Sequence, residues 1–303
     1  LAITLAKSDL GKLCEIIKRL PDLANKAHES LLNHLTSDQV VLLPEVDRMT
    51  LWESLDELIR KHRKHFSAEW ALSKAAIDRI EKTAKALTPI TPEYKYRHLF
   101  GGRDLDLYDD NGNYNDKMMR LDETRQAAIS EIIADGNVNA ALQFATKVDA
   151  PYEVGRALGE IASDEMEGLI LPSLLDSEDD TSVRVVAGFI WARFWKLKIE
   201  WVDAVLERIW SPEHQAKFLT LLPFEEEIWL RVSRCLMGTH EALYWKNVKV
   251  NPYGPDRELT VAIEKLLEHG RGGAAVMCVV RTADSKSRFN ESLATQALLS
   301  VLD

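Results

Sequence analysis

Cysteine, glycine and proline are all scarce in this chain. Its 303 residues include 3 cysteines, 14 glycines and 10 prolines. Cys14, Cys235 and Cys278 are too few and too widely spread for a disulfide framework, which excludes the disulfide-rich secreted domains. We therefore expect free thiols in a reducing, cytoplasmic compartment. The shortage of glycine and proline, the residues that break helices, favours an all-α protein.

Long apolar runs are also missing. No uninterrupted run approaches the roughly 18 residues that a membrane-spanning helix needs. Residues 1–7 lack the basic start and the long apolar core of a secretory signal. The sequence therefore predicts no membrane insertion. Because the chain begins with Leu1 rather than methionine, we expect it to be a fragment of a longer protein.

Basic residues are outnumbered by acidic ones. Lys and Arg together number 38 and Asp and Glu 48, which gives a net charge of −10. General binding to nucleic acid or to anionic membranes needs a basic face, because phosphate contacts dominate such binding. One local basic cluster is present, formed by Arg60, Lys61, Arg63 and Lys64. A nucleic-acid-binding helical scaffold is therefore an alternative, and it requires this cluster to continue onto neighbouring helices.

No known catalytic or nucleotide-binding motif occurs in the sequence. It has no Walker A phosphate loop, no His-Glu-x-x-His zinc motif, no nucleophile elbow and no Cys-x-x-Cys pair. We therefore predict a non-catalytic protein without a cofactor. An enzyme of unrecognised type is a further alternative. It requires a concave pocket in which titratable groups with perturbed pKa values converge.

His62 and His65 lie three residues apart, a spacing at which two imidazoles on one helix face can bind a metal ion. No cysteine or carboxylate stands at ligand spacing beside them, and the flanking lysines and arginines repel a cation. We therefore predict that the pair binds no metal and that it belongs to the basic C-terminal end of a solvated helix.

Helical periodicity recurs from one end of the sequence to the other. The pattern predicts about fifteen helices, mostly joined by short connections, with more than half of the residues helical. Such spacing is typical of helix-turn-helix pairs packed side by side. Because no strict repeat is present, we predict an irregular α-solenoid, a superhelix of stacked pairs like those of HEAT or tetratricopeptide proteins.

Local signals predict where several helices begin and end. Thr50 and Glu53 form a capping box that predicts a helix start at Thr50. Ser73 and Ser211 are expected N-caps, and Gly136 is expected to end a helix that begins near residue 120.

The segment from residue 150 to residue 210 carries two further signals. Gly155 and Gly159 have the small-xxx-small spacing that lets two helices approach closely. Separate helices are predicted over residues 181–197 and 199–210, which places a break in the chain between them.

Tryptophan is concentrated in one part of the chain, because six of the eight fall between residues 191 and 245. Trp191 and Trp195 are four residues apart on one helix face, so we expect at least one of them to pack in the core against the following helix. The alternative is that aromatic residues build a partner-binding groove, for which Trp191, Trp195, Trp245 and Tyr244 are the candidates.

The polar segment of residues 101–119 breaks the helical pattern with a run of Asp, Asn and Gly. It does not match an EF-hand, because no carboxylates stand at the first and last loop positions when its glycine is aligned. We therefore predict an N-terminal helical part over residues 1–100, an acidic linker over residues 101–119 and a C-terminal helical-repeat part over residues 120–303.

Several short phrases together resemble one group of bacterial proteins. They are Leu51-Trp52-Glu53, Ile59-Arg60-Lys61-His62, Ala68-Glu69-Trp70-Ala71-Leu72, His98-Leu99-Phe100, Arg125-Gln126-Ala127-Ala128, Val154-Gly155-Arg156-Ala157-Leu158, Tyr244-Trp245-Lys246 and Leu266-Leu267-Glu268-His269-Gly270-Arg271. They resemble the helical-repeat region that follows a nucleoside-triphosphatase or other effector domain in large multidomain bacterial proteins, including STAND-type antiphage defence proteins. This sequence contains no such effector domain. The resemblance implies a cytosolic recognition or scaffolding role in antiviral defence.

These observations lead to one functional prediction. We expect a non-catalytic module that recognises a protein partner on the concave surface of an α-solenoid, as part of a larger bacterial protein.

Overall fold

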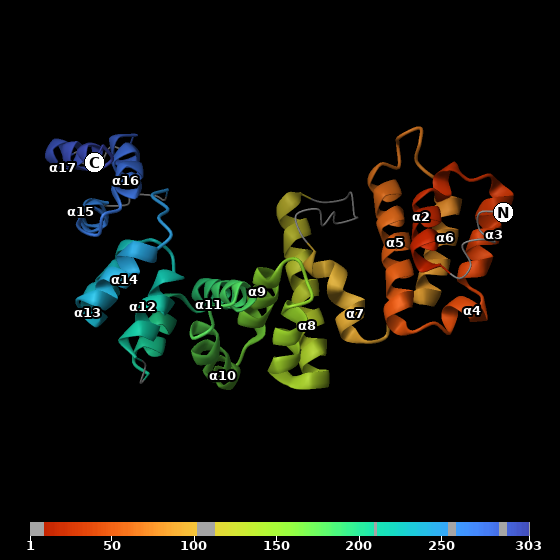
Figure 1. The fold of residues 1–303 in the computed structure, drawn as a ribbon, viewed down its shortest axis with the longest axis horizontal. Coiled ribbons are helices and arrows are strands. Elements are labelled where there is room, and N and C mark those ends of the chain that lie inside the picture. Colours follow the sequence, from red (N-terminus) through yellow and green to blue (C-terminus); the bar gives the residue numbers. More distant parts are fainter. Residues whose placement is uncertain (1–8, 102–112, 209–210, 254–258, 285–289, 303) are drawn as a thin grey trace. The chain divides into compact units, whose positions relative to one another are not determined.

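The computed structural model describes residues 9–101, 113–208, 211–253, 259–284 and 290–302. Within these residues every regular element is a helix and none is a strand, which confirms the predicted all-α class. None of the helices described there has the length and apolar character that crossing a membrane requires. The chain forms two compact units, unit 1 (Leu1–Pro151) and unit 2 (Tyr152–Asp303). Figure 1 shows the helices of the described residues in chain order.

The boundary between the two units lies later in the sequence than the acidic segment that we predicted as a linker. Residues 102–112 of that segment lie outside the described residues. Its last part is helical, because α8 (Tyr114–Ala145) already begins at Tyr114. The predicted parts over residues 1–100 and 120–303 therefore differ from the compact units, which divide after Pro151.

Packing between the end of η2 (Arg97–Phe100) and α8 explains this position. The Phe100 ring contacts the Phe144 ring edge-to-face, with the ring centroids 5.2 Å apart. The Arg125 Nε donates a hydrogen bond of 2.9 Å to the Leu99 carbonyl, and the Ala150 amide donates one of 3.0 Å to the Phe100 carbonyl. These contacts attach α8 to the N-terminal helices, which the sequence alone did not indicate.

Among its described residues, unit 1 has seven further elements besides η2 and α8. They are α2 (Leu10–Lys18), η1 (Leu20–Asp22), α3 (Asn25–Leu35), α4 (Asp38–Val41), α5 (Glu45–Lys64), α6 (Lys74–Leu87) and α7 (Pro92–Tyr96). Helix α5 packs against both α2 and α6. Fully buried Ile17, Leu55 and Ile80 from these three helices share one core with leucines of α3, and each such side chain contributes about 1.5–3 kcal/mol by its removal from water.

The start of α5 differs from the predicted capping box. The helix begins at Glu45, directly after Pro44, and Thr50 lies in its interior, where the Thr50 hydroxyl donates to the Val46 carbonyl at 3.1 Å. The prediction at Thr50 and Glu53 is wrong because Pro44 stops any extension of the preceding helix and acidic residues in the first turn favour a start there.

The N-caps at Ser73 and Ser211 are confirmed, since Ser73 accepts from the Ala76 amide and Ser211 accepts from the His214 amide. The predicted helix end at Gly136 is wrong, because α8 continues to Ala145. A local break nevertheless follows. Asn137 has a φ of 64°, and its side-chain oxygen accepts from the Asn139 amide at 2.8 Å. The backbone therefore departs from helical geometry at Asn137, although no loop divides α8 there.

Unit 2 contains nine helices among its described residues, the first of which begins at the unit boundary. They are α9 (Pro151–Ile161), α10 (Asp164–Leu175), α11 (Asp180–Leu206), α12 (Pro212–Thr220), α13 (Glu226–Cys235), α14 (Thr239–Asn247), α15 (Thr260–Glu268), α16 (Gly272–Asp284) and α17 (Glu291–Leu299). The apolar run of residues 276–280 lies in α16.

Helices α9 and α11 approach each other closely in unit 2. A Cβ atom added at Gly155 would lie 2.0 Å from the Val185 carbonyl oxygen, and one at Gly188 would lie 2.1 Å from the Tyr152 carbonyl oxygen. Because no side chain fits at either position, the two backbones contact each other directly. The close helix contact predicted for this region is confirmed. Each helix contributes a glycine to it, Gly155 on α9 and Gly188 on α11.

We expect Gly188→Ala to destabilise the protein by about 2 kcal/mol or more, because the new methyl group must push α11 away from α9. Gly168→Ala is the matched control, since Gly168 also lies in a helix but has no neighbouring atom within 4 Å of an added Cβ. That change should stabilise the protein by about 0.5–1 kcal/mol through helix propensity. Urea unfolding of both variants measures the difference, and equal effects would contradict the close contact.

Candidate functional site

Helix α11 has apolar side chains on its exposed face as well as on its buried face. Val183, Ala187, Trp191 and Trp195 follow one another at intervals of four residues, so they form one stripe along the helix. Ala187 is half-buried and the other three are exposed, Trp191 by 38% and Trp195 by 49%. A surface helix ordinarily carries polar residues on this side. We call these four residues the tryptophan stripe.

The two tryptophans of the stripe contact each other. Their ring centroids lie 5.6 Å apart with the ring planes at 64°. Phe194, which is buried, contacts Trp195 edge-to-face at 5.5 Å, and the Lys198 ammonium lies 4.6 Å from the centroid of the Trp195 ring. These edge-to-face and cation–π contacts hold the rings at the surface in a defined arrangement.

The expectation that Trp191 or Trp195 packs in the core is therefore wrong. The buried face of α11 is filled by other residues, among them Val185 and Phe189. With the Gly155 and Gly188 contacts holding that face against α9, the stripe is left on the surface.

Tyr244 and Trp245, the two other aromatic candidates for a partner-binding surface, are buried. Trp245 lies among the rings of Phe224, Trp229 and Tyr244. Burial is the largest influence on Tyr244 and strongly raises the pKa of its phenol. Both residues therefore belong to the core of unit 2 and cannot contact a partner.

Helix α11 is kinked at Lys198. The kink lies between the two helices that we predicted over residues 181–197 and 199–210. Lys198 has φ 59° and ψ −156°, a backbone conformation that is essentially restricted to glycine. A side chain in this conformation costs about 1–3 kcal/mol, so contacts elsewhere must hold the two halves of the helix in place.

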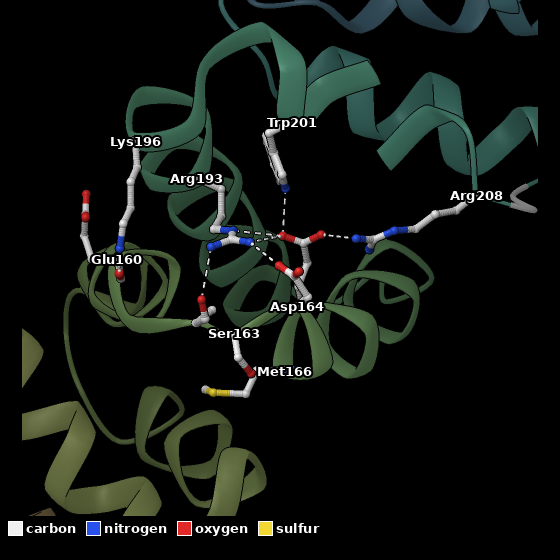
Figure 2. Close-up of polar contacts among 10 residues, drawn as sticks. Glu160, Ser163, Asp164, Met166, Arg193, Lys196, Trp201 and Arg208 are labelled. Atoms are coloured by element: carbon white, nitrogen blue, oxygen red, sulfur yellow. Dashed lines mark hydrogen bonds and ion pairs between the residues drawn. The ribbon is translucent and has the colours of Figure 1, made fainter. Parts of the chain in front are cut away.

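Glu167 of α10 supplies these contacts. Its side chain is completely buried. The Arg193 Nε donates to the Glu167 Oε2 at 2.8 Å, and the Trp201 indole N–H donates to the same oxygen at 2.7 Å. The Arg208 guanidinium lies 2.6 Å from the Oε1. Figure 2 shows Arg193, Trp201 and Arg208 pointing toward one another from different parts of the chain.

The position of these partners along α11 gives the carboxylate its structural role. Arg193 precedes the kink at Lys198, whereas Trp201 and Arg208 follow it. Arg193 also donates to the Ala162 carbonyl at 3.0 Å. One buried carboxylate therefore connects both halves of α11 to α10, and its negative charge is matched by hydrogen bonds and cations. We call Glu167, Arg193, Trp201 and Arg208 the carboxylate clamp.

The carboxylate clamp was not among the features predicted from the sequence. A signal was present, since Arg193 is the one charged residue within residues 185–195, a run of otherwise apolar side chains. An arginine in such a run is buried only when an acid pairs with it. The acid lies 26 residues earlier, and nothing local identifies it.

Two of the four residues in the basic cluster predicted on α5 form ion pairs with neighbouring carboxylates. The Arg60 Nε lies 3.2 Å from the Asp56 carboxylate, and Arg63 forms an ion pair with Glu81 of α6. The two arginines thus face carboxylates, while Lys61 and Lys64 are exposed.

His62 and His65 both contact the Trp70 ring, each with 5.3 Å between ring centroids. His62 is buried, and its Nδ1 accepts the Leu72 amide at 3.0 Å. Burial, and then the charge of Lys61, lower the pKa of His62. Its imidazole thus stabilises the turn after α5. In the described part of the chain, no three His, Cys, Asp or Glu residues are grouped so that they could hold a metal ion.

Comparisons with known proteins assign no family to the chain. No protein-family model, no curated protein and no solved structure matches it. The case for a function therefore depends on the tryptophan stripe and the residues that hold it.

Replacing Glu167 should test the carboxylate clamp. We expect Glu167→Gln to destabilise the protein by about 3–5 kcal/mol, because it leaves the buried Arg193 without its counter-ion. Asp164→Asn is the matched control. Asp164 pairs with the same guanidinium at 3.3 Å, but its side chain is 94% exposed, so stability should hardly change. Denaturant unfolding that showed equal effects for the two variants would contradict the clamp.

Lys198→Gly should stabilise the protein by about 1 kcal/mol or more, because glycine adopts the Lys198 backbone conformation without strain. Lys198→Ala keeps the strain and removes the cation–π contact with Trp195, so it should be no more stable than the original protein. Thermal unfolding of the two variants separates the backbone effect from the side-chain effect. A glycine variant that melts no higher than the alanine variant would show that the conformation is unstrained.

Proposed function

We propose that this protein is a non-catalytic interaction module that binds a protein partner through the tryptophan stripe of α11. The observation that carries the proposal is the exposed pair Trp191 and Trp195 on a helix whose opposite face is already packed in the core. Exposed tryptophans that lie side by side are typical of the centres of protein interfaces, where they contribute much of the binding energy.

The way α11 is held supports this proposal. The glycine contacts with α9 and the carboxylate clamp fix both halves of the helix. The contact between the two indole rings fixes the side chains. A surface that is already ordered before binding loses little conformational entropy when a partner arrives, so more of the contact energy appears as affinity.

The spacing of the stripe favours a helical partner. Residues at intervals of four along α11 form a ridge, and such a ridge packs into the groove between ridges on another helix. The Lys198 ammonium at the end of the stripe favours an acidic side chain on the partner. We propose that the partner presents an amphipathic helix with an apolar face and an acidic residue beside it.

Further parts of the proposal rest on the sequence. We propose that the helices form stacked pairs of an irregular α-solenoid in a cytoplasmic protein, and that the module serves recognition in a larger bacterial defence protein. The short connections between helices support the solenoid. The three free thiols support the cytoplasmic location, and the resemblance of the short phrases supports the role in defence.

The nucleic-acid alternative has less support than the protein partner. Arg60 and Arg63, the strongest phosphate-binding candidates, face the carboxylates of Asp56 and Glu81. Phosphate binding at this cluster would have to compete with these ion pairs.

We expect the double substitution Trp191→Ala and Trp195→Ala to leave the melting temperature nearly unchanged but to weaken partner binding about 100-fold or more. Leu230→Ala on α13, which removes another exposed apolar side chain of unit 2, is the matched control and should bind normally. A photo-reactive amino acid in place of Ala187 captures the partner in cells, and binding of the purified partner is then measured by calorimetry.

Two results would contradict the proposal. Unchanged affinity in the double variant would remove the stripe from the interface. Capture of a second copy of the same chain, with loss of self-association in the double variant, would assign the stripe to a homodimer.

A further inference from the structure

Unit 1 contains an open cleft of about 290 Å³ between α5 and α6. Its volume is near the lower end of the range for small-molecule sites. The cleft lies entirely within unit 1, so its geometry is independent of the tryptophan stripe in unit 2.

Three of the side chains that line the cleft are apolar. Trp52, Ile59 and Ala84 present carbon surface to it. Ile59 and Ala84 belong to the core between the two helices. The Trp52 ring is fixed by an edge-to-face contact with His98, with 5.1 Å between the ring centroids and 68° between the planes. A held indole is suited to contact a flat ring of a ligand.

The polar lining of the cleft carries an excess of positive charge. Arg60, Arg63 and Lys85 line it together with two acids, Asp56 and Glu81. Each arginine pairs with one of these acids, whereas no carboxylate of the described residues lies within ion-pair distance of the Lys85 ammonium. The charged groups that line the cleft therefore sum to one positive charge, which Lys85 carries.

Two titratable groups at or beside the cleft, Asp56 and His98, are poorly solvated. Burial is the largest influence on Asp56 and raises the pKa of its carboxyl group. Burial, and then the charge of Arg60, lower the pKa of His98 to about 4, so this imidazole is neutral near pH 7 and adds no charge.

We propose that this cleft binds a small planar organic anion, one aromatic ring bearing a carboxylate or a phosphate, with its ring against Trp52 and its anionic group at Lys85. The apolar lining accounts for the ring, and the excess positive charge accounts for the anion. Arg60 and Arg63 line the same cleft but are paired with Asp56 and Glu81, so we assign the anionic group to Lys85.

Calorimetric titration of the full chain tests this proposal with phenyl phosphate and benzoate as the probes. We expect saturable binding with millimolar or lower dissociation constants. Inorganic phosphate, which has no ring, and benzyl alcohol, which has no charge, should each bind at least about fivefold more weakly. This pattern requires both halves of the cleft to contribute.

Lys85→Gln should weaken the binding of phenyl phosphate about five- to tenfold, since it removes the unpaired cation. Lys82→Gln, on the same helix but outside the cleft lining, is the matched control and should bind phenyl phosphate normally. Because both lysines are exposed, neither change should disturb folding, and a melting curve checks this.

Three outcomes would overturn the proposal. One is equal affinity of the Lys85→Gln and Lys82→Gln variants for phenyl phosphate. Another is inorganic phosphate binding as tightly as phenyl phosphate, which would leave the aromatic ring without a role. The third is the absence of saturable binding of either aromatic anion up to about 10 mM. None of these outcomes bears on the tryptophan stripe.

Discussion

Unit 2 depends on the pairing of one buried carboxylate. Glu167 lies out of contact with water, where an unpaired charge would be very costly, and three partners from α11 and the segment that follows it approach it. These partners stand on both sides of the strained residue Lys198. The carboxylate therefore explains why α11 can be bent, why both of its halves remain on α10, and why its outer face is presented to solvent in one orientation.

The sequence predicted those parts of the fold that depend on neighbouring residues. Ser73 and Ser211 act as N-caps because the groups that they bind lie three residues away. The boundary between the helices predicted over residues 181–197 and 199–210 coincides with the kink at Lys198. The capping box at Thr50 misled because the stronger signal, Pro44, stood just before it. The division into units depends on contacts of Phe100 with residues far along the chain, and no local pattern records them.

The candidate site was only partly predictable, for the same reason. Trp191 and Trp195 were recognised as a pair, but their side of the helix was assigned to the core. Which side of an apolar helix is buried depends on what packs against it, and here Gly155 and Gly188 decide the matter through backbone contact with α9. Tyr244, one of the predicted partner-binding candidates, is buried by rings from other helices. Predicting which residues are exposed on a helix with apolar side chains on both faces thus requires tertiary information.

Gly188 and Trp191 are three residues apart on α11, yet the fold tolerates substitution at these two positions very differently. Any side chain at Gly188 collides with the backbone of α9, so that position is closed to change. Trp191 has solvent on one side, so folding places few demands on it, and under the proposed function its identity is constrained by the partner. New binding preferences can therefore arise by substitution along the outer side of α11 while the inner side keeps the architecture constant. Under the proposed function, this separation would give one helix both a constant inner face and a variable recognition surface.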